Sequence, residues 1–255
     1  MKKIIKFIKN IINILFDRKI KIIGKFQNWK VALQNSTSYN NKVIFQKTKK
    51  SFEQVLKKNA KFERDSIAFY ENSPDKELIS IIKKIYKNKK IIICDFGGSL
   101  ASLYFQNKDY LDPDKYQWHV IEQKQYVKYA KNNMNNKNLK FHTKFNSLPK
   151  KKIDLVIFSS VLQYIEFPDL ILKKVFEKKT KNIIITRTPF HNKEDVIKIQ
   201  VVPKHIYAAS YPIRIFNKKN FLNKIKIHGY KIKKKLSVEE AIDGYVYQGF
   251  YFKKN

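Results

Sequence analysis

The chain has 255 residues, of which 43% are hydrophobic, so it is long enough to bury the core of one domain and an extension. Its formal net charge is +33, but lysines spread along the chain dominate its 54 basic residues, which predicts a solvated basic surface and makes nucleic acid a less favoured partner than a small molecule. Its one cysteine, Cys94, excludes an intrachain disulfide and is typical of a reducing cytoplasm.

The first residues form an amphipathic pattern. On an ideal helix, the polar residues of 1–17 fall on one face and the isoleucines, leucine and phenylalanines take the rest. The segment is too short and too charged to span a bilayer, and it lacks the apolar core of a secretory signal. We therefore expect residues 1–23 to form a basic helix that either packs on its own domain or lies on the inner membrane surface.

Residues 24–88 are expected to form a polar helical segment before the main domain. A loop is expected around residues 35–41, and Ser73-Pro74 marks a break. In the last helix of the segment, Leu78, Ile81 and Ile82 lie on one face and lead into an apolar run.

From residue 89 to residue 255, strand and helix patterns alternate. This alternation predicts an α/β domain with a mostly parallel sheet and right-handed crossovers. The last two strand candidates leave no room for a helix between them, so we expect an antiparallel pair at the sheet edge. The expected strands are 90–95, 117–122, 139–142, 153–158, 182–186, 229–236 and 245–252, and the expected helices are 99–107, 124–132, 168–177 and 217–225.

The first of these strands ends in an acidic residue and a glycine pair. Asp95, Phe96, Gly97 and Gly98 follow an isoleucine run, at the position where parallel sheets bind nucleotide-type cofactors. The glycines are adjacent, so the Gly-x-Gly pattern of dinucleotide folds is missing, and no Gly-Lys-Ser/Thr follows as in a P-loop.

This turn resembles motif I of class I S-adenosylmethionine-dependent methyltransferases. The resemblance implies a Rossmann-like methyltransferase sheet with S-adenosylmethionine (SAM) as the cofactor. It also implies that Asp95 helps to hold the methionine end and that Gly97 and Gly98 allow close backbone approach. Glu122 ends the second strand, one βαβ unit further on, where a carboxylate accepts the ribose hydroxyls; the alternative is a solvated residue at a strand end.

The strand over residues 153–158 is followed by Ser159 and Ser160, which the resemblance implies as contacts of the cofactor together with Phe96. In this class of enzymes the strand end faces the reacting methyl group, and amino-methylating members carry an Asn/Asp-Pro-Pro-aromatic motif there. The two serines replace that motif, which argues against adenine or amide N-methylation and favours O-methylation.

Several segments together are similar to one family of bacterial methyltransferases associated with surface-polysaccharide gene clusters. The similarity covers roughly residues 24–252, with Ser99 as a departure where many relatives carry a further glycine. It implies methyl transfer without naming the acceptor. The segments are 62–66, 95–98, 159–164, 187–190 and 206–212.

The remaining candidates concern the acceptor. A hydroxyl acceptor benefits from a general base, for which His205, His191 and Tyr164 are candidates, although each is also compatible with a structural role. We expect acceptor contacts from Arg187, which follows a strand where ligands bind, and from Gln163, Arg64 and Tyr211. The alternative for Arg187 is an ion pair with Asp65 or Glu63, and Glu63-Arg64-Asp65 could also brace a helix. The histidines and the cysteine show no metal-ligand spacing, so no metal is expected.

Three functions are therefore compared. The first is a cytoplasmic methyltransferase, in possible peripheral contact with the inner membrane surface, that modifies a sugar or surface-glycan precursor. The second is an RNA methyltransferase, motivated by the net charge. The third is a non-catalytic binding protein that keeps the fold.

Overall fold

The computed structural model describes residues 19–39, 42–87, 89–149, 152–238 and 240–255. The basic helix expected over residues 1–23 lies outside them up to residue 18, so both interpretations of that part stay predictions. Its expected end at residue 23 is wrong, because a strand begins at Lys21. None of the helices in the described ranges has the length and apolar character needed to cross a membrane.

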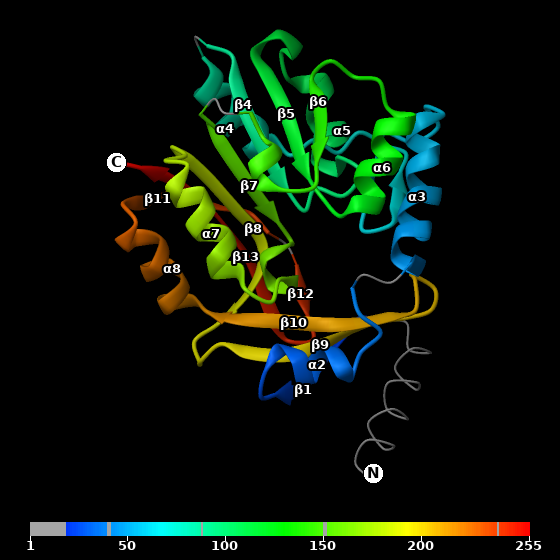
Figure 1. The fold of residues 1–255 in the computed structure, drawn as a ribbon, viewed down its shortest axis with the longest axis vertical. Coiled ribbons are helices and arrows are strands. Elements are labelled where there is room, and N and C mark those ends of the chain that lie inside the picture. The colour runs from blue at the N-terminus through cyan, green and yellow to red at the C-terminus, as the bar shows by residue number, and fades with distance from the viewer. Residues whose placement is uncertain (1–18, 40–41, 88, 150–151, 239) are drawn as a thin grey trace.

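A parallel sheet forms the centre of the molecule, as the alternating pattern predicted (Figure 1). Its five parallel strands lie in the order β6-β5-β4-β7-β8, so the first strand of the domain is central. Their sequences are nearly continuous apolar runs because both faces of the sheet are covered. The strands are β4 (Ile91–Phe96), β5 (Tyr116–Ile121), β6 (Leu139–His142), β7 (Leu155–Ser159) and β8 (Asn182–His191).

Helices connect these strands and cover the sheet on both faces. Alternate residues of each strand enter two separate cores: Ile93 and Trp118 belong to one, and Cys94 and Val156 belong to the other. The helices are α3 (Lys42–Leu56), α4 (Lys76–Tyr86), α5 (Ser102–Asn107), α6 (Lys124–Asn133), α7 (Pro168–Glu177) and α8 (Lys218–Ile227). Short 3₁₀ turns lie at Lys108–Tyr110, Pro113–Lys115, Phe145–Ser147 and Leu162–Tyr164.

The expected antiparallel pair at the end of the chain is confirmed. β11 (Tyr230–Leu236) pairs with β13 (Tyr245–Lys254), and β13 pairs antiparallel with β8. A short strand, β12 (Ala241–Ile242), also pairs with β13.

A second, antiparallel β-layer was not predicted. β1 (Lys21–Phe26), β9 (Val196–Val202) and β10 (Ala209–Asn217) pair side by side, and the end of β10 runs parallel to the end of β8. The helix α2 (Trp29–Gln34) packs on this layer. In Figure 1, β9 and β10 cross below the carboxyl ends of the parallel strands. The insert between β8 and α8 therefore closes the side of the sheet where ligands bind in α/β folds.

The expectation that residues 24–88 are entirely helical is wrong at two places. β1 extends into this range, and β2 (Phe62–Arg64) and β3 (Ile67–Phe69) form a hairpin. Its two loop residues, Asp65 and Ser66, both have positive φ angles, of 53° and 65°. This is the geometry of the tight hairpin turn that usually requires Asn-Gly, so the sequence carried no turn signal at this position.

Candidate functional site

The backbone around the carboxyl ends of β4, β7 and β8 is strained. Non-glycine residues rarely adopt positive φ angles, and they persist where the surrounding structure holds them. Several such residues gather here: Asp65, Ser66, Ser99, Ala101, Ser160 and Arg187. Positive φ angles at Gly97, Ser99 and Ala101 also keep residues 97–101 out of the helix, so the helix expected over 99–107 begins at Ser102.

The glycine pair after β4 is required by close contacts. A Cβ atom on Gly98 would meet Asp95 Oδ2 at 2.5 Å. On Gly97, which has a φ of 72°, a Cβ would meet Val161 Cγ2 at 2.3 Å. The turn is thus packed between the carboxylate that ends its own strand and the loop after β7. The side chain of Phe96 does not line this turn and instead stacks on Phe145, at 5.4 Å between ring centroids.

Three carboxyl groups surround the turn. Burial raises the pKa of Glu63 to about 8 and that of Asp95 to about 7, against partial compensation from hydrogen bonds. Loss of hydration likewise raises the pKa of Glu122 to about 7, although the amides of Gln123 and Ser99 donate to it. No lysine or arginine forms an ion pair with these groups among the residues that the structure describes. The turn is therefore a site where a cation would be stabilised.

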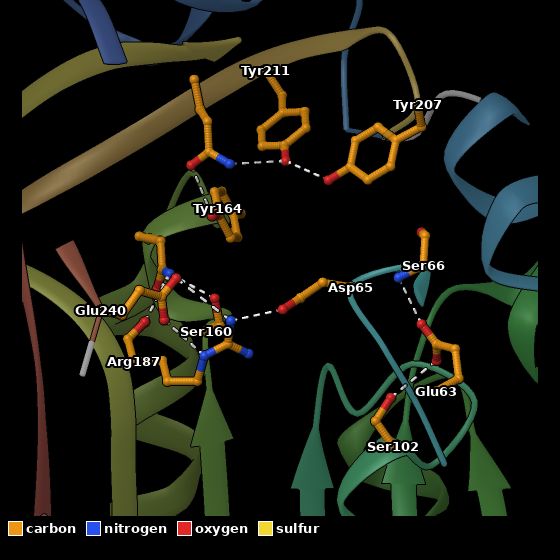
Figure 2. A network of polar contacts seen from close by, with 12 residues as sticks. Glu63, Asp65, Ser66, Ser102, Ser160, Tyr164, Arg187, Tyr207, Tyr211 and Glu240 are labelled. Atoms are coloured by element: carbon orange, nitrogen blue, oxygen red, sulfur yellow. Dashed lines mark hydrogen bonds and ion pairs between the residues drawn. The ribbon is translucent and has the colours of Figure 1, made fainter. Parts of the chain in front are cut away.

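Glu63 reaches the turn from the β2–β3 hairpin. Its carboxylate accepts hydrogen bonds from Ser66 N at 2.7 Å and from Ser102 Oγ at 3.1 Å (Figure 2). It therefore ties the hairpin to the start of α5. The sequence offered Glu63 as an ion-pair partner of Arg187 or as part of a segment that braces a helix. It did not connect Glu63 with the glycine turn, because nothing local shows that the hairpin folds over this turn.

Arg187 lies between two carboxylates. Its Nη2 donates to Asp65 Oδ2 at 2.7 Å, and its Nε donates to Glu240 Oε2 at 2.8 Å (Figure 2). These partners raise the pKa of the guanidinium even though burial opposes this. The structure thus confirms the alternative that Arg187 pairs with Asp65 and adds Glu240, which no sequence signal connected with it. Gln163 is fully buried and donates to the carbonyl of Arg187 at 3.1 Å, so it supports the strained backbone there.

Arg64 forms no hydrogen bond with these groups among the residues that the structure describes. Its guanidinium lies over the rings of Phe62 and Phe69, at 5.8 and 5.2 Å from their centroids. Burial, followed by repulsion from Arg187, lowers the pKa of the guanidinium. The Glu63-Arg64-Asp65 segment forms one end of the β2–β3 hairpin, and through the hydrogen bond between Glu63 and Ser102 it braces the start of helix α5, as the alternative expected.

A network of tyrosines and one glutamine joins the antiparallel layer to the 3₁₀ turn at Leu162–Tyr164. Tyr164 Oη donates to Gln200 Oε1 at 3.0 Å, and Gln200 Nε2 donates to Tyr211 Oη at 3.1 Å (Figure 2). Tyr207 and Tyr211 share a hydrogen bond of 2.9 Å between their hydroxyl groups. Burial raises the pKa of all three tyrosines, so their hydroxyls are neutral near pH 7.

Three adjoining cavities connect these groups. The cavity over the glycine turn has a volume of about 80 Å³, and its walls include Asp95, Gly97, Gly98, Glu122, Ser159 and Ser160. A cavity of about 420 Å³ lies against β7, β8 and the segment after β11, and a cavity of about 230 Å³ lies against the tyrosine network. Asp65 and Arg187 line all three.

The two histidine candidates lie elsewhere. His205 is exposed in the turn after β9, and His191 Nε2 lies 2.8 Å from the carbonyl oxygen of Glu194. Neither lines any of the three cavities, because the unpredicted layer carries residues 191–205 past the strand ends. Tyr164 and Tyr211 do line the 230 Å³ cavity. Among the described residues, no three His, Cys, Asp or Glu side chains form a group that could hold a metal ion.

Comparisons with known proteins identify the fold. No family model matches the chain, and no curated protein does. Among solved structures, the N-terminal domain of EvdMO1 in the presence of SAH and D-fucose is 12% identical, with a TM-score of 0.52, over 85% of this chain and 97% of that one. A SAM-dependent methyltransferase from Clostridium acetobutylicum ATCC 824 is 13% identical, with a TM-score of 0.50, over 82% and 98%. The chain has the Rossmann-like fold of class I methyltransferases.

Proposed function

We propose that this protein is a SAM-dependent methyltransferase. The observation that carries the proposal is the group of carboxyls with raised pKa values, Glu63, Asp95 and Glu122, around the glycine turn. SAM carries a sulfonium and an ammonium group, and a cationic ligand would compensate buried carboxylates that lack cationic partners. The fold supports this assignment because EvdMO1 binds SAH, the product of methyl transfer from SAM.

The residues fit such a cofactor. Gly97 and Gly98 would permit the close approach of its methionine end, Asp95 would bind the amino group, and Glu122 would accept the ribose hydroxyls. When bound, SAM supplies an electrophilic methyl group. The protein aligns the acceptor with it and excludes water, which is worth on the order of 7 kcal/mol at best.

A hydroxyl acceptor must lose its proton during the reaction. Asp65 lines the cavity at the glycine turn and both neighbouring cavities, and its side chain is 55% exposed. We therefore propose that the Asp65 carboxylate accepts this proton. His205 and His191 do not line the cavities and are not proposed for this role.

The proposed acceptor is a sugar or a surface-glycan precursor, methylated on oxygen. Ser159 and Ser160 at the end of β7, in place of an amino-methylation motif, support oxygen as the methylated atom. The presence of D-fucose in the EvdMO1 structure supports a sugar acceptor. The two larger cavities lie where an acceptor could approach the glycine turn.

Titration calorimetry with SAM and SAH tests the proposal. We expect saturable binding that Glu122→Ala weakens by at least about tenfold, because a buried hydrogen-bonding partner is lost. Glu71→Ala, at an exposed carboxylate outside the cavities, is the matched control and should bind as the wild type does. The absence of heat with either ligand would refute the assignment.

One observation favours a second candidate, a binding protein that keeps the fold without catalysis. The cavity over the glycine turn is about 80 Å³, whereas ligand sites usually span about 300–1,000 Å³. A cofactor would have to extend into the neighbouring cavity or displace the β2–β3 hairpin. The same calorimetry separates the two candidates, since the second predicts no binding of SAM.

A further inference from the structure

The cavities differ in charge from the rest of the chain. Although lysine dominates the composition, no lysine of the described ranges lines any of the three cavities. The cations among them are Arg64 and Arg187. The carboxylates are Glu63, Asp65, Asp75, Glu77, Asp95, Glu122 and Glu240.

The cation that lines both acceptor-side cavities is already neutralised. Arg187 lines the 420 Å³ and 230 Å³ cavities, and two carboxylates contact its guanidinium at 2.7 and 2.8 Å. A phosphate or carboxylate that bound Arg187 would have to displace Asp65 or Glu240. The displaced group would then face the incoming anion at short range, which is strongly unfavourable in a partly buried site.

The other polar groups of the acceptor side are neutral. Tyr164, Tyr211 and Gln200 line the 230 Å³ cavity and already exchange hydrogen bonds with each other. Hydroxyl and amide groups both donate and accept, so they can exchange these bonds for bonds to the hydroxyls of a ligand. This wall therefore suits a hydroxylated molecule and offers no charge to an anion.

We propose that the acceptor binds between Arg187 and the tyrosine–glutamine network, and that it is a hydroxylated small molecule without a phosphate or carboxylate group. This inference rests on the proposed function and narrows its acceptor class. The two ion pairs of Arg187, with Asp65 and with Glu240, disfavour the binding of anions. A diphosphate carrier on a glycan precursor would therefore have to lie outside the cavities.

The test compares three sugars of similar size, D-fucose, D-glucosamine and D-fucose 1-phosphate, by saturation-transfer NMR titration with saturating SAH. For the wild type we expect D-fucose and D-glucosamine to bind at least about tenfold more tightly than the phosphate. Equal or tighter binding of the phosphate, or no binding of the two other sugars, would overturn the inference.

Charge removal then tests the mechanism of selection. Asp65→Asn with Glu240→Gln leaves Arg187 without its carboxylates, so the affinity for D-fucose 1-phosphate relative to that for D-fucose should rise at least about tenfold. The control Asp109→Asn with Asp114→Asn removes the same charge at exposed positions and should not alter the ranking. An unchanged ranking in the first variant would overturn the role of the ion pair. If that variant does not fold, Glu240→Gln alone should shift the ranking in the same direction.

The two proposals fail in different ways. Calorimetry with SAH alone decides the proposed function. If SAH does not bind, the sugar titrations are read without it, and the ranking of the three sugars still decides the charge selection.

Discussion

At the scale of single residues, Gly98 shows how tightly the turn after β4 is built. Its absent side chain leaves room for the Asp95 carboxylate, which would lie 2.5 Å from an added Cβ. Asp95 also accepts a hydrogen bond from Trp118 Nε1 at 3.3 Å, so it cannot move away without breaking that contact. The glycine therefore fixes the position of a carboxylate that the proposed cofactor needs.

We expect Gly98→Ala to lower the free energy of unfolding by about 1–3 kcal/mol through overpacking, and to weaken SAM binding by at least about tenfold. Chemical denaturation and titration calorimetry measure the two effects. Gly244→Ala is the control, because Gly244 has a φ of 80° but no atom within 4 Å of an added Cβ. It should cost about 1–2 kcal/mol of stability from backbone strain alone and leave SAM binding unchanged. Equal SAM affinity in both variants would contradict this explanation.

The raised pKa values predict a pH dependence. Carboxyl groups in the unfolded chain have pKa values of about 4. In the folded chain the pKa is about 7 for Asp95 and Glu122 and about 8 for Glu63. At pH values between these two sets of pKa values, the folded chain therefore binds more protons than the unfolded chain. The stabilisation from these groups is complete below about pH 4 and is lost as the pH rises through 7 to 8.

A cationic ligand favours the ionised carboxylates, so its binding should release protons. We expect SAM affinity to rise between pH 6 and pH 8, by about tenfold per pH unit for each proton released. Calorimetry at pH 7 in two buffers of different ionisation enthalpy counts these protons. Glu122→Gln should lower the count, and a wild-type count of zero would contradict the prediction.

At the scale of secondary-structure elements, the parallel sheet could be predicted and the antiparallel layer could not. The long apolar runs of β4 and β7 can only be buried strands, so their alternation with helices determines the architecture. β9 carries the polar residues Lys198 and Gln200, and one of its two partner strands, β1, is far away in the sequence. The pairing of β9 with β1 depends on contacts that no local pattern encodes.

The same difference explains which residues of the candidate site could be predicted from the sequence. Asp95, Gly97, Gly98 and Glu122 follow strands of the parallel sheet, and their positions come from local patterns. Glu240 reaches Arg187 from the segment after β11, across 53 residues, so no spacing rule connects them. Placement of the histidines failed for the same reason, because it depended on the path of the unpredicted layer.

Some of the many lysines have a structural role, which is seen on the strand β11. Among the described strands it pairs only with β13, so its other edge is open, and Lys231, Lys233, Lys234 and Lys235 are exposed along it. Charged side chains on an edge strand oppose pairing with a second molecule.

We expect Lys233→Val with Lys235→Val to make the protein aggregate without unfolding it. Valine increases the β-propensity of the open edge and removes its charge. Light scattering during incubation at constant temperature measures the rate of assembly. Lys173→Val with Lys174→Val changes two exposed lysines on helix α7 and is the control. Equal assembly rates in both variants would show that general charge loss, and not the edge, is responsible.

At the scale of the whole molecule, the charge of the cavities differs from that of the remaining surface. Among the described residues, no lysine lines the three cavities, whereas seven of the chain's 21 acidic residues do. An RNA methyltransferase needs basic groups beside its site to neutralise the phosphates. The acidic lining therefore argues against the RNA function, and the outer charge needs a different explanation.

Contact with an anionic membrane is one explanation of the outer positive charge, and the sequence of the first residues supports it. The sequence of residues 1–17 predicts a helix with a basic face and an apolar face, and each lysine near an anionic surface contributes about 1 kcal/mol. We expect the full-length protein to co-sediment with vesicles of phosphatidylglycerol and phosphatidylcholine at low salt, and less so as salt screens the charges. Replacement of Lys2, Lys3 and Lys6 by glutamine should then reduce the bound fraction severalfold.

The matched control removes the same charge from another place. Replacement of Lys231, Lys233 and Lys235 by glutamine takes three lysines from the exposed face of β11 and leaves residues 1–17 intact. If the amphipathic pattern binds the membrane, this control should retain nearly all of its co-sedimentation. If both variants lose the same fraction, the membrane responds to the net charge of the molecule, and residues 1–17 have no special part in it. If the wild type does not co-sediment at all, the pattern is better explained by a helix that packs on its own domain.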